Sequence, residues 1–138
     1  CDGPRHIKIS SRPGTFTHLH CSAAGKVLLA FVVRQDVESF FQGEALEKHS
    51  ANTITDIAEL KKEIGKVLRR GYAVDDMEYY DGVRCVAAPV RDVYGNTVAA
   101  VGITAPAQNL KPREVPVVAR TVMEIADHIS RSMGELQA

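Results

Sequence analysis

The sequence predicts an α+β fold in which helices pack against an antiparallel sheet. Two patterns carry this prediction. Runs of small and β-branched residues lie on either side of a turn-rich pentapeptide, residues 92–96, and apolar residues recur every three to four positions after Asp56 and after Pro112. The 138 residues, 45% of them hydrophobic, are sufficient for one domain with its own core.

The N-terminal part of the chain contains a predicted strand and a predicted helix. Over residues 6–10 apolar and polar residues alternate, which is the period of a half-buried strand, and Pro13-Gly14 ends it. Ser22 is a favourable N-cap for the helix that follows. The apolar positions of that helix have the spacing of an amphipathic face: Ala24, Val27, Leu28 and Phe31.

Three further helical segments precede the predicted sheet. Residues 36–42 and 44–49 are expected to form short helices separated by Gly43. The clearest helix begins after Asp56, with Glu59 as its capping-box partner, and ends at Gly71. Its apolar face comprises Ile57, Leu60, Ile64, Val67 and Leu68.

Three strands make up the predicted sheet. Residues 72–76 form the first, and an acidic, tyrosine-rich connection follows over residues 77–82. Residues 83–91 and 97–105 are joined by a turn that contains Asp, Gly and Asn, which favours an antiparallel hairpin. Pro89 lacks an N–H group, so we expect it at a bulge or an edge.

A long helix closes the chain. Pro112 suits its first turn, and Gly134 is expected to fray its end. Its apolar face is expected at Val118, Val122, Ile125, Ile129 and Met133. The nearly heptad spacing also fits a dimer seam, but the pattern spans too few heptads, so packing on the sheet is the favoured interpretation.

Composition and charge exclude several classes of protein. Seventeen Lys and Arg residues balance seventeen Asp and Glu residues, so the chain lacks the basic excess of a free-standing nucleic-acid-binding module. The longest apolar run, residues 27–33, is far shorter than the roughly 20 residues of a membrane-spanning helix, so no membrane partner is expected. Three cysteines favour a reducing, cytoplasmic location over a disulfide-stapled secreted domain. Because the chain begins at Cys1 in a turn-like sequence, we expect further sequence upstream.

Two places in the sequence have the composition of a ligand site. After Ser22, unpaired backbone N–H groups at the start of a helix lie beside small residues, which suits an anion such as a carboxylate; an ordinary capped helix is the alternative. In the hairpin, the two-residue period places small residues, one thiol and one hydroxyl on one face. These residues are Val83, Cys85 and Ala87 on the first strand, and Val98, Ala100, Gly102 and Thr104 on the second.

Metal and acid–base chemistry receive little support from the spacing. His18, His20 and Cys21 are metal-compatible residue types, but a short His-x-His without a second ligand pair predicts no metal site. Asp75 and Asp76 are consecutive strand residues that face opposite sides, so they do not share a proton. One of the two is expected to point inward and the other to water.

Several motifs, in order, resemble the C-terminal domain of IclR-type transcriptional regulators. Residues 19–30, LHCSAAGKVLLA, are similar to the family pattern LH-x-[ST]-A-x-GKA-x-LA. The segments that follow, TITD at 53–56, RGYAVD at 70–75, DGVRCVAAPV at 81–90 and GITAP at 102–106, match further family signatures. The resemblance covers about residues 5–134.

The resemblance implies a GAF-like, or profilin-like, fold and a C-terminal effector-binding domain over residues 1–138. In the family, an N-terminal winged helix-turn-helix outside this sequence binds operator DNA, and the bacterial protein is a homodimer or homotetramer that acts as a repressor or activator. No enzymatic activity and no cofactor are implied. The resemblance implies that this domain itself binds a small-molecule effector, and a carboxylate is the expected chemical class.

The resemblance also places the effector site. Backbone or small side-chain contacts map onto Ala23, Ala24 and Val83, and side-chain contacts map onto Asp75, Cys85, Gly102 and Thr104. Relatives can carry a hydroxyl residue where this chain has Gly102, and glycine where it has Ala23. We therefore expect a sensor of a small organic acid or related metabolite. Two alternatives are a GAF-like thiol enzyme or redox sensor that uses Cys85, and a pure oligomerisation module.

Overall fold

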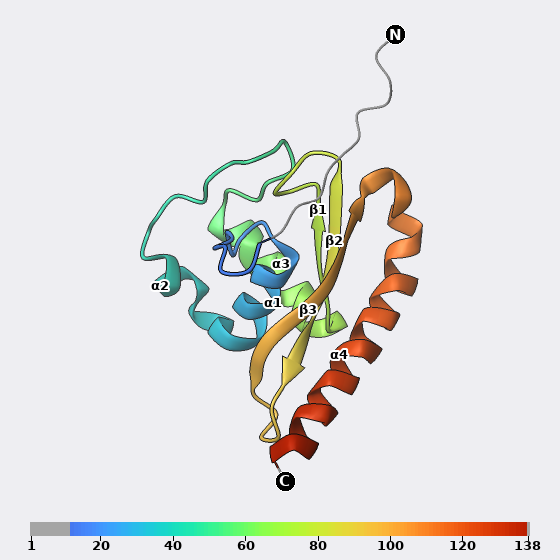
Figure 1. Cartoon of the computed structure of the whole chain (residues 1–138). Coiled ribbons are helices and arrows are strands. Elements are labelled where there is room, and N and C mark those ends of the chain that lie inside the picture. The colour runs from blue at the N-terminus through green and yellow to red at the C-terminus, as the bar shows by residue number, and fades with distance from the viewer. Residues whose placement is uncertain (1–11, 138) are drawn as a thin grey trace.

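A computed structural model describes residues 12–137 as an antiparallel sheet with helices on both faces (Figure 1). The three strands lie in the order β1-β2-β3, and they are Ala73–Asp76, Val83–Arg91 and Thr97–Pro106. The predicted α+β class and the predicted hairpin are both confirmed. The strand predicted over residues 6–10 lies outside the described residues.

The register of β2 explains where its proline is tolerated. Pro89 lies opposite Ala100, past the point where β1 ends its pairing at Ala87. It also precedes the register shift between Val90 and Arg91 by one residue. The missing N–H group is therefore accommodated beside a bulge and beyond the shorter strand, as the sequence predicted.

The helix that Ser22 caps is followed by shorter helical turns. It runs over Ala23–Leu28 as α1, widens to a π-helical turn over Leu29–Val33, and continues through a 3-10 turn into α2, Val37–Phe41. The predicted helix at 44–49 is wrong, because these residues are irregular. Leu46 inserts into the core, and the carbonyl of Glu47 accepts a hydrogen bond from His20 Nε2 at 2.8 Å instead of joining a helical ladder.

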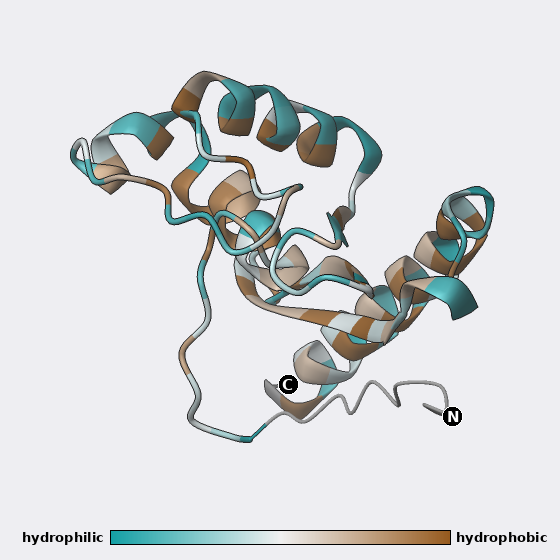
Figure 2. Ribbon diagram, turned by 90° about the horizontal axis from the view of Figure 1, so that it is seen from above, coloured by the Kyte–Doolittle hydropathy of each residue, from teal (hydrophilic) through white to brown (hydrophobic). Residues whose placement is uncertain are grey.

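The helix α3, Ile57–Arg70, begins and ends where the sequence predicted. Asp56 Oδ1 accepts from the N–H of Glu59 at 3.0 Å, and Gly71 closes the helix in the left-handed conformation, with φ of 85°. The Glu59 carboxylate pairs with Lys62 at 3.0 Å, so the return bond of a capping box is not formed among the described residues. Figure 2 shows the apolar face of this helix turned toward the sheet.

The last helix, α4 at Val115–Gln137, follows a 3-10 turn at Pro112–Glu114 and packs on β2. The predicted packing on the sheet is correct, and so is most of the predicted face, because Val122 is buried and Val118, Ile129 and Met133 pack against the same cluster. Ile125 is 47% exposed, and the buried positions are Val115, Ala119, Val122 and Ala126. The predicted fraying at Gly134 is wrong, because the helix continues through it to Gln137. The glycine packs closely on the hairpin turn: an added Cβ would lie 3.2 Å from Val93 Cγ1.

The side chains of β2 alternate between two hydrophobic clusters. Ala87 belongs to the cluster formed with α1 and α3, whereas Val86 and Ala88 belong to the cluster formed with α4. A strand covered on both faces has buried residues at consecutive positions, as β2 has from Val86 to Val90. Within residues 12–137, no helix combines the length and the apolar character that crossing a membrane requires.

Candidate functional site

A cavity of about 1010 Å³, here called the large cavity, lies where the start of α1 meets the β2–β3 hairpin. The segment before α1 and the connection that follows β1 also contribute to its wall. All seven residues singled out from the sequence line it: Ala23, Ala24, Asp75, Val83, Cys85, Gly102 and Thr104. The structure therefore brings together positions that lie up to 81 residues apart in the sequence.

The start of α1 is held close to the segment that precedes it. Ser22 Oγ accepts from the N–H of Gly25 at 3.1 Å and donates to the carbonyl of His18 at 2.7 Å. A Cβ at Gly25 would lie only 2.5 Å from Leu19 Cα, so this approach requires glycine. These contacts fix Ala23 and Ala24 at the edge of the large cavity.

The strand face of the large cavity carries a thiol and a hydroxyl side by side. Cys85 and Thr104 are register partners on β2 and β3, and Sγ lies 3.3 Å from Oγ1. Two residues nearer the hairpin turn, the next pair on the same face of the sheet is Ala87 and Gly102. This part of the wall offers polar atoms next to very small side chains, which suits a compact ligand with its own polar groups.

Asp75 supplies a buried carboxyl group to the same cavity. Its Oδ1 accepts from the backbone N–H groups of Glu78 at 2.7 Å and Tyr79 at 3.3 Å. Burial raises the pKa of Asp75, although these two N–H groups partly oppose the rise. Asp76 points the other way and binds Arg84 at 2.7 Å, so the predicted opposite orientation of the two aspartates is confirmed.

The two described cysteines are protected rather than activated. Burial raises the pKa of the Cys21 thiol to about 12 and raises the pKa of the Cys85 thiol as well. Reactive cysteines depend on a lowered pKa, which increases the thiolate fraction. Both thiols therefore stay protonated at neutral pH, which is the opposite of what the thiol-enzyme interpretation requires.

Sequence reasoning missed several residues of the large cavity. Arg12 and Phe16 reach it from the irregular segment before α1, and nothing in the residue pattern of that segment indicated a contact. Tyr79, Tyr80 and Asp81 reach it from the connection after β1. Their only signal was the unusual concentration of tyrosine and acidic residues in that connection.

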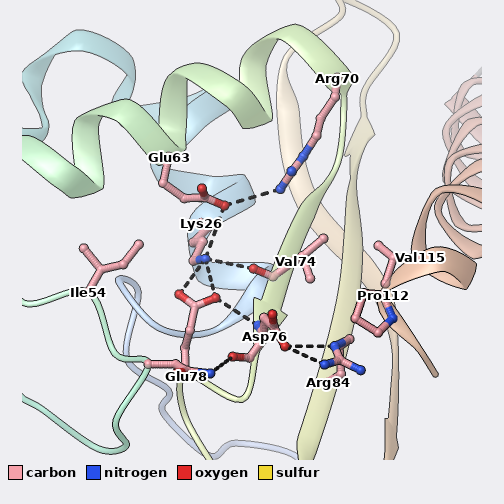
Figure 3. Close-up of a pocket in the computed structure, with 11 residues that line it drawn as sticks. Lys26, Ile54, Glu63, Arg70, Val74, Asp76, Glu78, Arg84, Pro112 and Val115 are labelled. Carbon is pink, nitrogen blue, oxygen red and sulfur yellow. Dashed lines mark hydrogen bonds and ion pairs between the residues drawn. The ribbon is translucent and has the colours of Figure 1, made fainter. Parts of the chain in front are cut away.

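A second hollow of about 390 Å³, here called the charged cavity, lies on the other side of β1 (Figure 3). Lys26 is fully buried there, and its Nζ lies 2.7 Å from Oε1 of Glu78 and 2.8 Å from the carbonyl of Val74. Glu63 links Lys26 to Arg70, at 3.5 and 3.3 Å.

The charged cavity serves as a support for the large cavity. Its acidic and basic groups neutralise one another, which leaves little net charge to attract a ligand. Burial raises the pKa of Glu78, and Lys26 opposes that rise. Because Glu78 also donates its N–H to Asp75, the ion-pair network fixes one wall of the large cavity.

The histidines considered for metal binding lie beside the large cavity and not in its lining. His18 and His20 are next to Glu47 and His49, which come from the segment between α2 and α3. Cys21, the third residue of the sequence motif, is completely buried.

Comparisons with known proteins agree on the family. The chain matches the family described as bacterial transcriptional regulator IclR C-terminal over residues 1–131. It is 33% identical over 122 residues to the HTH-type transcriptional regulator BhcR of Paracoccus denitrificans, which covers 88% of this chain and 44% of BhcR. The chain thus spans about half the length of the curated relatives it matches.

Solved structures show the same fold. The IclR protein of Thermotoga maritima is 34% identical, with a TM-score of 0.84 over 97% of this chain and 54% of that chain. The inducer-binding domain of PobR from Acinetobacter, a double mutant in complex with 3-hydroxybenzoic acid, is 22% identical, with a TM-score of 0.75. It covers 92% of this chain and 75% of that chain.

Proposed function

The chain belongs to the IclR C-terminal family of bacterial transcriptional regulators, and on this premise we propose that its large cavity binds a small organic acid that controls operator binding by the full-length protein. Domains of this family bind effectors and are not enzymes. The observation that carries the proposal is the convergence of Asp75, Cys85 and Thr104 on one cavity beside the start of α1.

The lining residues suit an acid with a second polar group. Arg12 supplies a cation, and the backbone beside Ala23 and Ala24 can be approached closely because these side chains are small. Thr104 and Asp75 offer hydrogen-bonding groups to a hydroxyl or keto group at the other end of the ligand. The 3-hydroxybenzoic acid bound by the PobR domain has this combination of a carboxylate and a hydroxyl, which supports the class of ligand proposed here.

The regulatory step needs two assembly geometries. We expect the full-length protein to form a dimer or tetramer through which the effector changes the spacing of the DNA-binding domains. The effector then has to bind one geometry better than the other, with a coupling free energy of about 1–3 kcal/mol. If an effector that binds this domain leaves the operator affinity of the full-length protein unchanged, the regulatory part of the proposal is wrong.

The binding part is tested by a thermal-shift screen of this chain against keto acids, hydroxy acids, sugar acids and aromatic acids. A ligand at 100 times its dissociation constant adds about 2.7 kcal/mol to the free energy of unfolding. For a domain of this size that corresponds to a rise of roughly 9 °C in Tm. If no acid in the panel raises the Tm, the proposed ligand class is wrong.

Two variants locate the site. Thr104→Val removes the hydroxyl group beside Cys85, so affinity should fall about fivefold, the equivalent of one hydrogen bond. Thr97→Val is the matched control, because Thr97 lies on the same strand but outside the lining of the large cavity. Cys85→Trp should abolish binding by filling the cavity. Equal affinity in all three variants would place the ligand elsewhere.

A further inference from the structure

Three imidazole rings and one carboxylate meet beside the large cavity, from two segments far apart in the sequence. His18 and His20 precede α1, and Glu47 and His49 lie between α2 and α3. The ring centroids of His18 and His49 are 4.4 Å apart, and that of His20 is 5.8 Å from His18 and 6.1 Å from His49. Sequence spacing alone did not reveal this cluster, because His49 is 29 residues away from His20.

The donor atoms of three of these residues are spaced almost as metal ligands are. Glu47 Oε2 lies 3.8 Å from His18 Nε2 and 3.7 Å from His49 Nε2. In a tetrahedral zinc site with bonds of about 2.0–2.1 Å, neighbouring donors are about 3.3–3.4 Å apart. The two histidine–carboxylate distances exceed this spacing by a few tenths of an ångström, and all three ligand atoms lie within 4.8 Å of one another, so small side-chain rotations would bring them onto one ion.

The ring nitrogen Nε2 of His49, unpaired within residues 12–137, is a second, independent indication of a bound ion. It is buried, and none of the described residues forms a hydrogen bond with it. Buried polar atoms almost always have a partner, so a lone one calls for an explanation such as a bound ion. This nitrogen lies 3.7 Å from Glu47 Oε2, and the ligand atoms of His18, Glu47 and His49 all lie within 4.8 Å of one another.

The residues around the cluster hold it in position. His20 Nε2 bonds to the carbonyl of Glu47 at 2.8 Å, and the N–H of His49 donates to Thr53 Oγ1 at 3.0 Å. The Tyr79 ring stacks on His49 with centroids 5.1 Å apart and planes inclined by 7°. Such supporting contacts orient metal ligands before an ion arrives.

We propose that His18, Glu47 and His49 form a binding site for a divalent transition-metal ion of the Zn²⁺ type. Two imidazoles and a carboxylate favour zinc over Mg²⁺ or Ca²⁺, which prefer oxygen ligands alone. The fourth position is left to water. The ligand atoms of His20, Cys21 and His49 also lie within 4.8 Å of one another, but the Cys21 side chain is completely buried, so we leave it out of the proposed ligand set.

Among residues 12–137, these two segments are linked by one side-chain hydrogen bond, from His20 to Glu47, by the approach of His18 to Glu47 and by packing, and a metal ion would join them directly. Tyr79 is shared with the large cavity, so the ion would brace one wall of that cavity. The site does not depend on the proposed effector, because none of its three ligands lines the large cavity.

The test is a calorimetric titration of the untagged, chelator-treated chain with Zn²⁺ alone. We expect one equivalent to bind, and the same chain with Co²⁺ to develop the visible absorption of a tetrahedral site. Glu47→Gln should weaken Zn²⁺ binding at least tenfold, and His18→Ala should weaken it further. His128→Ala removes an exposed histidine on α4 and is the matched control, which should bind as the wild type does.

Folding defects do not obscure this test. The side chains of Glu47 and His18 are 67% and 42% exposed, so their variants should keep the far-UV circular dichroism of the wild type. The proposal is overturned if the wild-type chain takes up no Zn²⁺, or if Glu47→Gln and His18→Ala bind it as tightly as the wild type. It is also overturned if Cys21→Ala loses binding to the same extent as His18→Ala.

Discussion

At the scale of single residues, two glycines decide how closely the walls of the large cavity approach each other. Gly25 lets the loop before α1 contact the helix, and Gly102 lets β3 contact β2. A Cβ at Gly102 would lie 2.4 Å from the carbonyl oxygen of Val86 and 2.9 Å from Ala87 Cβ. The hydroxyl residue that relatives can carry at this position therefore does not fit the present backbone.

Gly102→Ser should lower the free energy of unfolding by about 1–3 kcal/mol, because the added atoms overpack a backbone contact. Urea denaturation measures this change. Gly65→Ala is the matched control: its Cβ meets nothing nearer than 3.5 Å inside α3, so the change should stabilise the chain by about 0.5–1 kcal/mol. A stable Gly102→Ser variant would show that the strands separate at low cost.

Asp75 should make stability depend on pH. Its pKa is raised in the folded chain by burial, so its contribution is most favourable at acidic pH and is lost as pH rises through the raised pKa. Asp75→Asn removes this loss and keeps an oxygen for the N–H of Glu78. The variant should therefore gain stability relative to wild type between pH 4 and pH 7.

Urea unfolding of both proteins at the two pH values measures this effect. Asp127→Asn makes the same chemical change at an exposed position on α4 and serves as the control. A difference in stability between Asp75→Asn and wild type that stays constant from pH 4 to pH 7 would contradict the expectation.

At the scale of elements, the buried Lys26 ties α1 to β1 and to the connection after it. Lys26→Met should cost about 3–5 kcal/mol, because Glu78 and the carbonyl of Val74 lose their buried partner. The double variant Lys26→Met/Glu78→Gln should recover part of that loss. Lys61→Met, which breaks the exposed pair with Glu38, should change the free energy of unfolding far less, because solvent screens this pair.

Chemical denaturation of the four proteins checks this prediction. Equal losses in Lys26→Met and Lys61→Met would mean that the buried network contributes no more than a surface pair.

The same scale shows which elements the sequence can predict. The ends of α3 are encoded locally by Asp56 and Gly71, and the hairpin is encoded by its turn and its strand composition, so both were predicted correctly. The segment 44–49 was not, because the burial of Leu46 and the bond between His20 and Glu47 are tertiary contacts. On α4 the prediction included the exposed Ile125 and missed Ala119 and Ala126, since small alanines mark the contact with β2 as much as large apolar residues do.

The candidate site divides in the same way. Seven lining residues were found because they lie in recognisable motifs, although their role in binding stays a prediction. Arg12, Phe16 and the His49 side of the cluster came only from the fold, since their partners are remote in sequence and their segments have no regular period.

At the scale of the whole molecule, the sheet separates two hydrophobic clusters that share no buried residue. Leu60→Ala in one cluster should cost about 2–5 kcal/mol, and Val122→Ala in the other about 1–3 kcal/mol. The two losses should add within about 0.5 kcal/mol, as they do for sites without common partners.

Equilibrium unfolding of the single and double variants tests this independence. Leu60→Ala combined with Val67→Ala, within one cluster, is the comparison expected to depart from additivity. A large departure in the Leu60 and Val122 pair would instead show that the two faces of the sheet are packed as one unit.

The burial of β2 on both faces also limits how this protein can evolve. From Val86 to Val90 each side chain is buried, on the α4 face of the sheet or on the α1 and α3 face. A larger or charged side chain at any of these positions would therefore clash with the core or be buried in it. On β3, by contrast, Val98 and Ile103 are half-exposed and can vary. A library of all single substitutions selected for soluble expression should lose most variants in β2 and keep many in β3. Mutational tolerance along the hairpin would then follow its two strands, with Gly102, whose Cβ would meet the carbonyl oxygen of Val86, as an intolerant position on β3.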